Sequence, residues 1–293
     1  MLKNKKNIDW GENVMNLSFD LNDYLLIWNL LFLPSVTNDV QRLKEKLWKN
    51  YRHLYKDLYK EEAKILKDPK NYIPDDDTIF DMVKETEAYK RIRKETEEYR
   101  LFLMHYYNEI KKELVSYFKE LVRFDIKIYH VLVLNPRFNS VEMKTVKSRK
   151  VNTISWGMMR DQEDGEMAVI DILSHILKKE LKDYESDYKE IVEAIIELAI
   201  DNELSTRIKG KSCYLKGDNS LKFLKKQIYP YFLMYLGSSR DDMLNYMVRD
   251  GIVFDVDKYS LKRSLATYNL KEFITFCIEN QKYILKIEEL EII

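Results

Sequence analysis

The sequence contains few residues that reverse or interrupt the backbone, with seven glycines and five prolines among 293 residues. These two types together usually make up about 12% of a protein. Their shortage excludes a sandwich or barrel of many short strands, because such folds need frequent turns. We therefore expect a mainly α-helical protein.

Cysteine is also scarce, since only Cys213 and Cys277 are present and they lie far apart in the sequence. Without a CxxC pair, the sequence excludes a disulfide framework and a cysteine-based zinc site. The chain has no excess of charge either, with 49 basic and 49 acidic residues. This balance disfavours nucleic acid as a partner, because phosphate binding needs a surplus of lysine and arginine.

Long hydrophobic runs are missing. The most apolar stretch, Leu25–Leu33, is too short for a bilayer, which needs about 20 apolar residues. The basic start, Met1–Lys6, is followed by polar residues instead of the apolar core of a signal peptide. We expect no membrane contact and a cytoplasmic location. Abundant lysine, asparagine, isoleucine and tyrosine indicate an AT-rich bacterium or phage, and a phage protein would be virion-associated.

Apolar residues recur at spacings of three and four through most of residues 20–122, which predicts long helices. Proline steps between residues 68 and 74 interrupt the pattern, and a charged helix is expected over residues 78–122. We predict a helical N-terminal part, residues 1–122. The residues expected to be buried in it are Leu25, Trp28, Leu31, Leu47 and Leu54.

The pattern changes after residue 123. Short β-branched and apolar runs predict three strands, at residues 126–134, 141–146 and 151–156. Helical periodicity then returns at residues 167–181, 191–208, 221–236, 240–250 and from 270 to the C-terminus. The expected fold class is mainly α with a small α+β core. In it, residues 123–293 form a short three-stranded sheet packed on helices, followed by C-terminal helices.

One candidate metal site is visible in the helical spacing. Asp171 and His175 are four residues apart, so they lie on one face of the predicted helix. The next helix carries Glu193, Glu197 and Asp201, also at intervals of four. If the two helices pack together, Asp171, His175 and one of these acids could hold a cation. The alternative is that the acids form an ordinary solvated face.

The same residues resemble a known family. A strand ending in Trp156, a helix reading Ile170–His175 and a helix reading Glu197–Asp201 are similar to zincin-like metallopeptidase domains with helical N-terminal extensions. The resemblance covers residues 125–210, less than a third of the chain. It implies that His175 matches the second metal-binding histidine, that Asp201 matches the downstream acid, and that Asp171 replaces the first histidine.

The sequence departs from this family at Ile172, where a zincin carries the glutamate that takes a proton from the metal-bound water. Isoleucine cannot accept a proton. We therefore expect a non-catalytic zincin-like protein that acts through contacts with other proteins, in a structural or regulatory role, with no cofactor. The alternative is a metal-dependent hydrolase, with zinc held by Asp171, His175 and Glu197 or Asp201.

A third hypothesis concerns RNA. Arg100 and His105, followed by Tyr107, are similar to the Arg-x4-His signature of HEPN-type ribonucleases. The resemblance implies an Arg100 and His105 pair acting on the RNA backbone, but the polar residue usual after the arginine is replaced by Leu101. The aromatic and basic run from Trp48 to Lys60 could stack bases, although aromatics at helical spacing more often pack a core under lysine stems.

Overall fold

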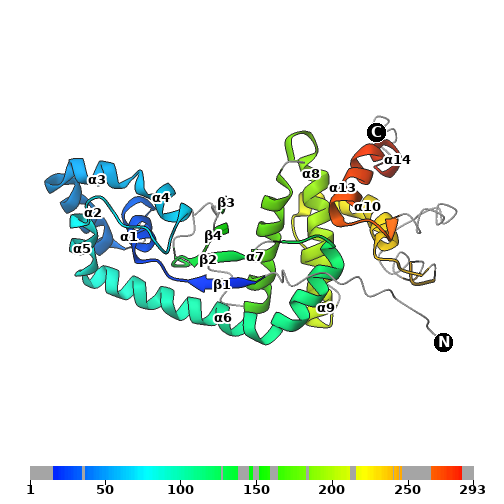
Figure 1. Ribbon diagram of the computed structural model, residues 1–293, viewed down its shortest axis with the longest axis horizontal. Helices are drawn as coiled ribbons and strands as arrows, with labels where there is room; N and C mark the ends of the chain where they lie inside the picture. Colours follow the sequence, from blue (N-terminus) through cyan, green and yellow to red (C-terminus); the bar gives the residue numbers. More distant parts are fainter. Residues whose placement is uncertain are drawn as a thin grey trace. The chain divides into compact units, whose positions relative to one another are not determined.

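The computed structural model (Figure 1) describes residues 16–34, 37–126, 128–137, 145–147, 152–158, 164–182, 185–211, 216–239, 241–243, 245 and 265–285. The chain forms two compact units. The first contains residues 1–101 and 125–159, and the second contains residues 102–124 and 160–293. This division differs from the predicted boundary at residues 122 and 123, because the strands group with the N-terminal helices.

The first unit contains short helices followed by one long one. They are α1 (Asp23–Phe32), α2 (Asn38–Asn50), α3 (Arg52–Leu58), α4 (Glu61–Lys67), α5 (Thr78–Lys84) and α6 (Glu87–Val122), whose later part belongs to the second unit. The predicted helix over residues 78–122 is broken after α5. There the hydroxyl of Thr86 accepts a hydrogen bond from the Tyr89 N–H at 3.2 Å and so starts a new helix.

The core of the first unit confirms most of the predicted burial. Leu25, Trp28, Leu31 and Leu47 are buried, and Leu54 is half-buried against the apolar cluster that contains Leu31 and Leu47. The indole N–H of Trp28 donates to the Tyr59 carbonyl at 3.2 Å, so its polar atom is satisfied inside the core.

A small sheet of four strands also belongs to the first unit. They are β1 (Leu17–Asp20), β2 (Tyr129–Val133), β3 (Thr145–Lys147) and β4 (Asn152–Trp156), in the order β1-β2-β4-β3. β1, β2 and β4 run parallel, and β3 pairs antiparallel with β4. The three predicted strands are present, although residues 141–144 lie outside the described residues.

The sheet therefore has one strand, β1, in addition to the three that were predicted. β1 has only four residues, too few for its alternating burial to stand out in the sequence. It is held by a partner more than a hundred residues away, with Leu17 opposite Tyr129 and Asp20 opposite Leu132. This long-range pairing is the reason that the strands group with the N-terminal helices.

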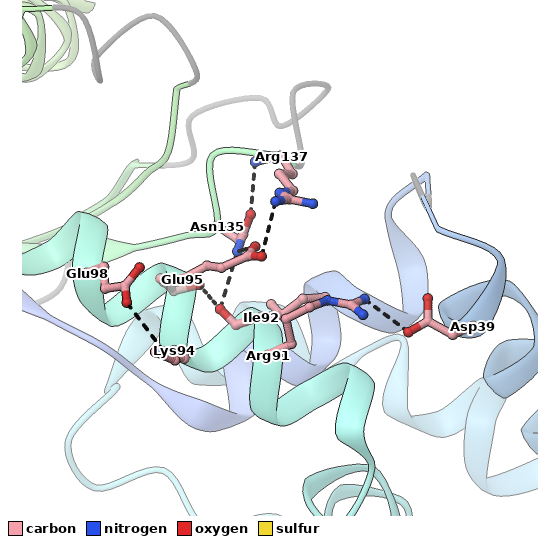
Figure 2. A network of polar contacts seen from close by, with 9 residues as sticks. Asp39, Arg91, Ile92, Lys94, Glu95, Glu98, Asn135 and Arg137 are labelled. Carbon is pink, nitrogen blue, oxygen red and sulfur yellow. Dashed lines mark hydrogen bonds and ion pairs between the residues drawn. The ribbon is translucent and has the colours of Figure 1, made fainter.

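Polar contacts fasten the end of β2 and the helix α2 to α6, as Figure 2 shows. The buried Asn135 amide donates to the Ile92 carbonyl and to Glu95 Oε2, both at 3.3 Å. Arg137 pairs with Glu95 at 3.1 Å, and Arg91 pairs with Asp39 on α2 at 3.0 Å. Buried amides need such partners, so Asn135 holds the turn after β2 on α6.

The regular secondary structure of the second unit is helical in the residues that the structure describes. Its elements besides the later part of α6 are α7 (Gly165–Glu180), α8 (Glu185–Ile196), η3 (Glu197–Leu204), α9 (Ser205–Lys209), η4 (Asn219–Leu221), α10 (Lys222–Tyr235), α13 (Leu270–Glu279) and α14 (Gln281–Ile284). The predicted mainly α fold is confirmed. Most of the predicted helix at residues 240–250, and everything beyond residue 285, lie outside the described residues. No helix in the described part of the chain is both long and apolar enough to cross a membrane.

Arg123 ends α6 and ties it to two other elements of the second unit. Its φ of 56° lies in the left-handed region, which breaks the helical hydrogen-bond pattern. The guanidinium donates to the carbonyls of Ala266 at 2.9 Å, Tyr268 at 3.0 Å and Tyr235 at 3.1 Å. The side chain thus satisfies carbonyls at the end of α10 and before α13.

Candidate functional site

A pocket of about 630 Å³ lies within the second unit and brings the predicted metal residues together. Asp171, His175, Glu197 and Asp201 all line it. The remaining lining residues are Asp164, Met167, Ala168, Ser174, Lys178, Lys216, Gly217 and Asp218. The four predicted residues, two from α7 and two from the following helical segment, therefore line one pocket.

Local contacts on α7 fix how it presents this face. The carboxylate of Asp164 caps the helix by accepting a hydrogen bond from the Met167 N–H at 3.0 Å, and it pairs with Lys209. One turn apart, His175 Nδ1 lies 3.0 Å from the Asp171 carbonyl. A carbonyl oxygen can only accept, so Nδ1 carries the proton and the Nε2 of a neutral His175 is an acceptor.

The acidic side of the pocket comes from η3, where hydrogen bonding changes from the α to the π pattern. Glu193, the first member of the predicted acidic stripe, lies before this change and does not line the pocket. It is half-exposed and lies 3.9 Å from Lys189. Glu193 lies one turn before η3, so the pocket takes only the second and third of the three evenly spaced acids.

Glu197 is bound by a lysine that the sequence analysis did not single out. The ammonium of Lys225 lies 2.7 Å from Glu197 Oε2, and both side chains are buried. Lys225 also donates to the Lys216 carbonyl at 2.5 Å. The Asp218 N–H donates to both carboxylate oxygens of Glu197, at 3.1 and 3.2 Å. The negative charge of Glu197 is therefore neutralised inside the protein.

A signal for Lys225 was present in the sequence. Leu221, Ile228, Phe232 and Tyr235 are spaced like a buried helical stripe, and Lys225 occupies a position within it. A lysine on such a stripe needs a buried acidic partner, because an unpaired charge in the core is very costly. The spacing thus pointed to an ion pair without naming Glu197.

Asp201 has the most unusual environment in the pocket. Burial raises the pKa of its carboxyl to about 7, and the negative charges of Asp171 and Glu197 add to the rise. Its Oδ1 is buried without a hydrogen-bond partner in the part of the chain that the structure describes. Perturbed carboxyl groups of this kind are concentrated at functional sites.

The described residues include no group of three or more histidine, cysteine, aspartate or glutamate side chains arranged to hold a metal ion. The pocket therefore gathers the four predicted ligands without showing a metal-binding arrangement, and the metal site stays a prediction. Ile172 is fully buried and does not line the pocket. The residue at this position of α7 therefore cannot take a proton from a water molecule in the pocket.

The zincin resemblance would combine the strands and α7 in one core. The structure assigns β2, β3 and β4 to the first unit and α7 to the second. Comparison of the chain with family models, with curated proteins and with solved structures finds no match. The zincin-like domain stays a hypothesis that rests on residues in the pocket.

The ribonuclease residues have separate surroundings. The guanidinium of Arg100 binds the Glu97 carboxylate at 2.6 and 2.8 Å and the Phe19 carbonyl at 3.2 Å. His105 is largely exposed, and its Nε2 lies 3.4 Å from Glu109. Side chains five residues apart on α6 do not share a helix face, so α6 does not present Arg100 and His105 as a pair.

The aromatic and basic run on α2 and α3 is partly packed and partly exposed. Tyr55 is half-buried and donates to the Leu31 carbonyl at 2.7 Å. Trp48 and Tyr59 are 43% and 62% exposed. The Arg52 guanidinium lies over the Trp48 ring at 5.0 Å from its centre. The expected packing under basic side chains therefore describes Tyr55 and Trp48 better than Tyr59.

A serine, histidine and aspartate cluster in the first unit was also missed by the sequence analysis. His130 Nδ1 lies 2.7 Å from Ser18 Oγ and 3.1 Å from Asp20 Oδ2. A hydrolytic triad needs the nucleophile and the acid on opposite ring nitrogens. Here both contact the same nitrogen, so the arrangement joins β1 to β2 and does not activate Ser18.

Proposed function

We propose that this chain is a non-catalytic protein with a zincin-like pocket, which acts through contacts with other proteins in a structural or regulatory role. The observation that carries the proposal is the binding of Glu197 by Lys225. A buried ammonium holds the carboxylate that a metal ion would need, so the positive charge comes from the chain itself.

The lack of a base at the position where the resemblance expects one supports the same proposal. In metal-dependent hydrolysis, proton removal from the bound water typically contributes about 10²–10⁴-fold to the rate. The position where the resemblance places this base holds the buried Ile172. A polar pocket without this general base is suited to binding a group without reacting with it. A partner protein can supply the group that the pocket binds.

A metal-dependent hydrolase using Asp171, His175 and Glu197 or Asp201 is the second candidate. The observation in its favour is Asp201, whose pKa of about 7 is close to the value that suits a general base at neutral pH. In this case a metal ion must either displace Lys225 from Glu197 or be held by the other residues without Glu197.

The deciding experiment compares cleavage of an unstructured protein substrate in the presence of zinc, with and without a chelator. We expect no cleavage by the wild-type chain. Ile172→Glu, alone and with Asp171→His, restores the residue types of the resembling family. Since Ile172 is buried and its variants are at risk of not folding, a second variant, Asp171→His, changes only a residue that lines the pocket. Zinc binding by this variant is read as a zinc-dependent rise in Tm.

A zinc-dependent rise in Tm for the second variant, with a silent wild-type chain, would support the proposal. Chelator-sensitive cleavage by the wild-type chain that His175→Ala abolishes would replace it with the hydrolase. No effect of zinc on any folded variant would contradict the zincin-like nature of the pocket.

A further inference from the structure

The pocket in the second unit contains an acceptor that the described residues leave unused. Asp201 lines the pocket, and its Oδ1 is buried without a hydrogen-bond partner among them. Leaving a buried polar group unsatisfied usually costs about 1–3 kcal/mol. Such a group in a pocket indicates a missing donor that enters from outside.

The charges around Asp201 indicate the sign of that donor. Burial is the main reason that the pKa of the Asp201 carboxyl is raised, and the negative charges of Asp171 on α7 and Glu197 on η3 add to it. The positive charges of Lys178 and Lys225 act in the opposite direction and contribute less. Lys225 is already bound to Glu197 and to the Lys216 carbonyl. A cationic donor therefore complements the site.

We propose that this pocket binds the ammonium or guanidinium group of a lysine or arginine side chain from a partner polypeptide, with Asp201 as the main acceptor and Asp171 as a second negative charge. The inference rests on the proposed function, because it names the chemistry of the protein partner.

An organic cation fits this site better than a metal ion for a geometric reason. A structural zinc needs about four ligands in one tight shell. No group of three such residues is arranged in this way in the described part of the chain. An ammonium or guanidinium needs only one or two carboxylates at hydrogen-bond distance. A cavity of about 630 Å³ is large enough for a long side chain.

The test is a titration of the full chain, labelled with ¹³C at aspartate carboxyl groups, with n-butylammonium as a mimic of the lysine side chain. We expect a saturable shift of the Asp201 carboxyl resonance. Asp201→Asn, read from the Asp171 carboxyl resonance, should weaken binding at least tenfold, whereas Asp241→Asn, at an exposed site, should not change it.

Three further probes separate the sources of the cation. 1-Butanol, which has a similar size and no charge, should not bind. A lysine tripeptide with blocked ends should bind at least as well as n-butylammonium, and spermidine should not bind better than the tripeptide. Stronger binding of spermidine would overturn the proposal in favour of a free polyamine. Displacement of n-butylammonium by stoichiometric Zn²⁺ would overturn it in favour of a metal.

A result that refutes cation binding by the pocket can be distinguished from one that refutes the proposed function. If n-butylammonium and the tripeptide leave the Asp201 resonance unchanged while the wild-type chain remains without peptidase activity, the inference is wrong and the non-catalytic assignment stands. Peptidase activity of the wild-type chain would refute the proposed function whatever the result of the titration.

Discussion

Lys225 and Glu197 form an ion pair that is almost entirely shielded from water, with 2.7 Å between the ammonium and Oε2. The two residues come from α10 and η3, and the chain between these elements contains α9, the segment with Gly217 and Asp218, and η4. Because the Asp218 N–H and the Lys216 carbonyl complete the hydrogen bonding, the pair is satisfied on both sides. It joins three segments of the second unit around the pocket.

The first prediction is that breaking this pair strongly destabilises the fold. Lys225→Met or Glu197→Gln leaves one buried charge uncompensated, so each should lower the free energy of unfolding by about 3–5 kcal/mol. The double variant should lose clearly less than the sum of the two. Urea denaturation of the four proteins measures this coupling.

The matched control for the ion pair is exposed. Lys90 and Glu87 lie 3.1 Å apart on the solvent face of α6. Lys90→Met should change stability by no more than about 0.5 kcal/mol. Equal effects of Lys90→Met and Lys225→Met would show that the pair with Glu197 is not buried as described.

The second prediction concerns pH. The pKa of Asp201 is about 7 in the folded protein, above its value of about 4 in the unfolded chain. Between these values the folded state holds a proton that the unfolded state has lost, so stability should fall as the pH rises from about 4 to about 7. In Asp201→Asn this part of the pH dependence should disappear, and the variant should gain stability over wild type at pH 8.

Unfolding in urea at pH 5 and pH 8 is the appropriate measurement for Asp201. Asp241→Asn, at an exposed position, serves as the control and should keep the wild-type pH dependence. An unchanged difference between pH 5 and pH 8 in Asp201→Asn would mean that this carboxyl titrates normally.

The third prediction is that two tryptophans of the first unit differ in importance. Trp28 is 4% exposed and its indole N–H is bonded to Tyr59, whereas Trp48 is 43% exposed. Trp28→Ala should cost about 3–5 kcal/mol, because it removes a large buried side chain. Trp48→Ala should cost much less. Thermal unfolding of the two variants side by side decides the matter, and a larger loss for Trp48→Ala would contradict the described packing.

The fourth prediction concerns Gly217, which approaches Glu197 closely. Its φ is +109°, and a Cβ at this position would lie 2.3 Å from Glu197 Oε2. Gly217→Ala should therefore displace the turn and weaken the ion pair with Lys225. Gly210→Ala is the control, since Gly210 also has a positive φ of 63° but open space around it. It should show only the cost of a left-handed residue, about 1–2 kcal/mol.

The loss for Gly217→Ala should exceed that for Gly210→Ala, and it should shrink when Lys225→Met is already present. Urea denaturation of these variants measures both quantities. Additive losses would indicate that Gly217 and the ion pair are independent.

The sequence alone predicted the mainly helical fold, because the spacing of apolar residues and the shortage of glycine and proline are local signals. It also predicted that Asp171 and His175 share a face, which the geometry of a single helix ensures. The burial of Trp28 and Leu47 followed from the same periodicity.

Other features were decided only by tertiary structure. The pairing of β1 with β2 joins residues more than a hundred positions apart, and four residues carry too little pattern to reveal it. The pocket ends between Glu193 and Glu197, although the three acids are evenly spaced in the sequence. Lys225 was not singled out from the sequence, and a charge on an apolar stripe cannot by itself specify which acid lies across from it. Only the packing of η3 and α10 selects Glu197, because charge pairing in a core depends on distances that sequence separation does not determine.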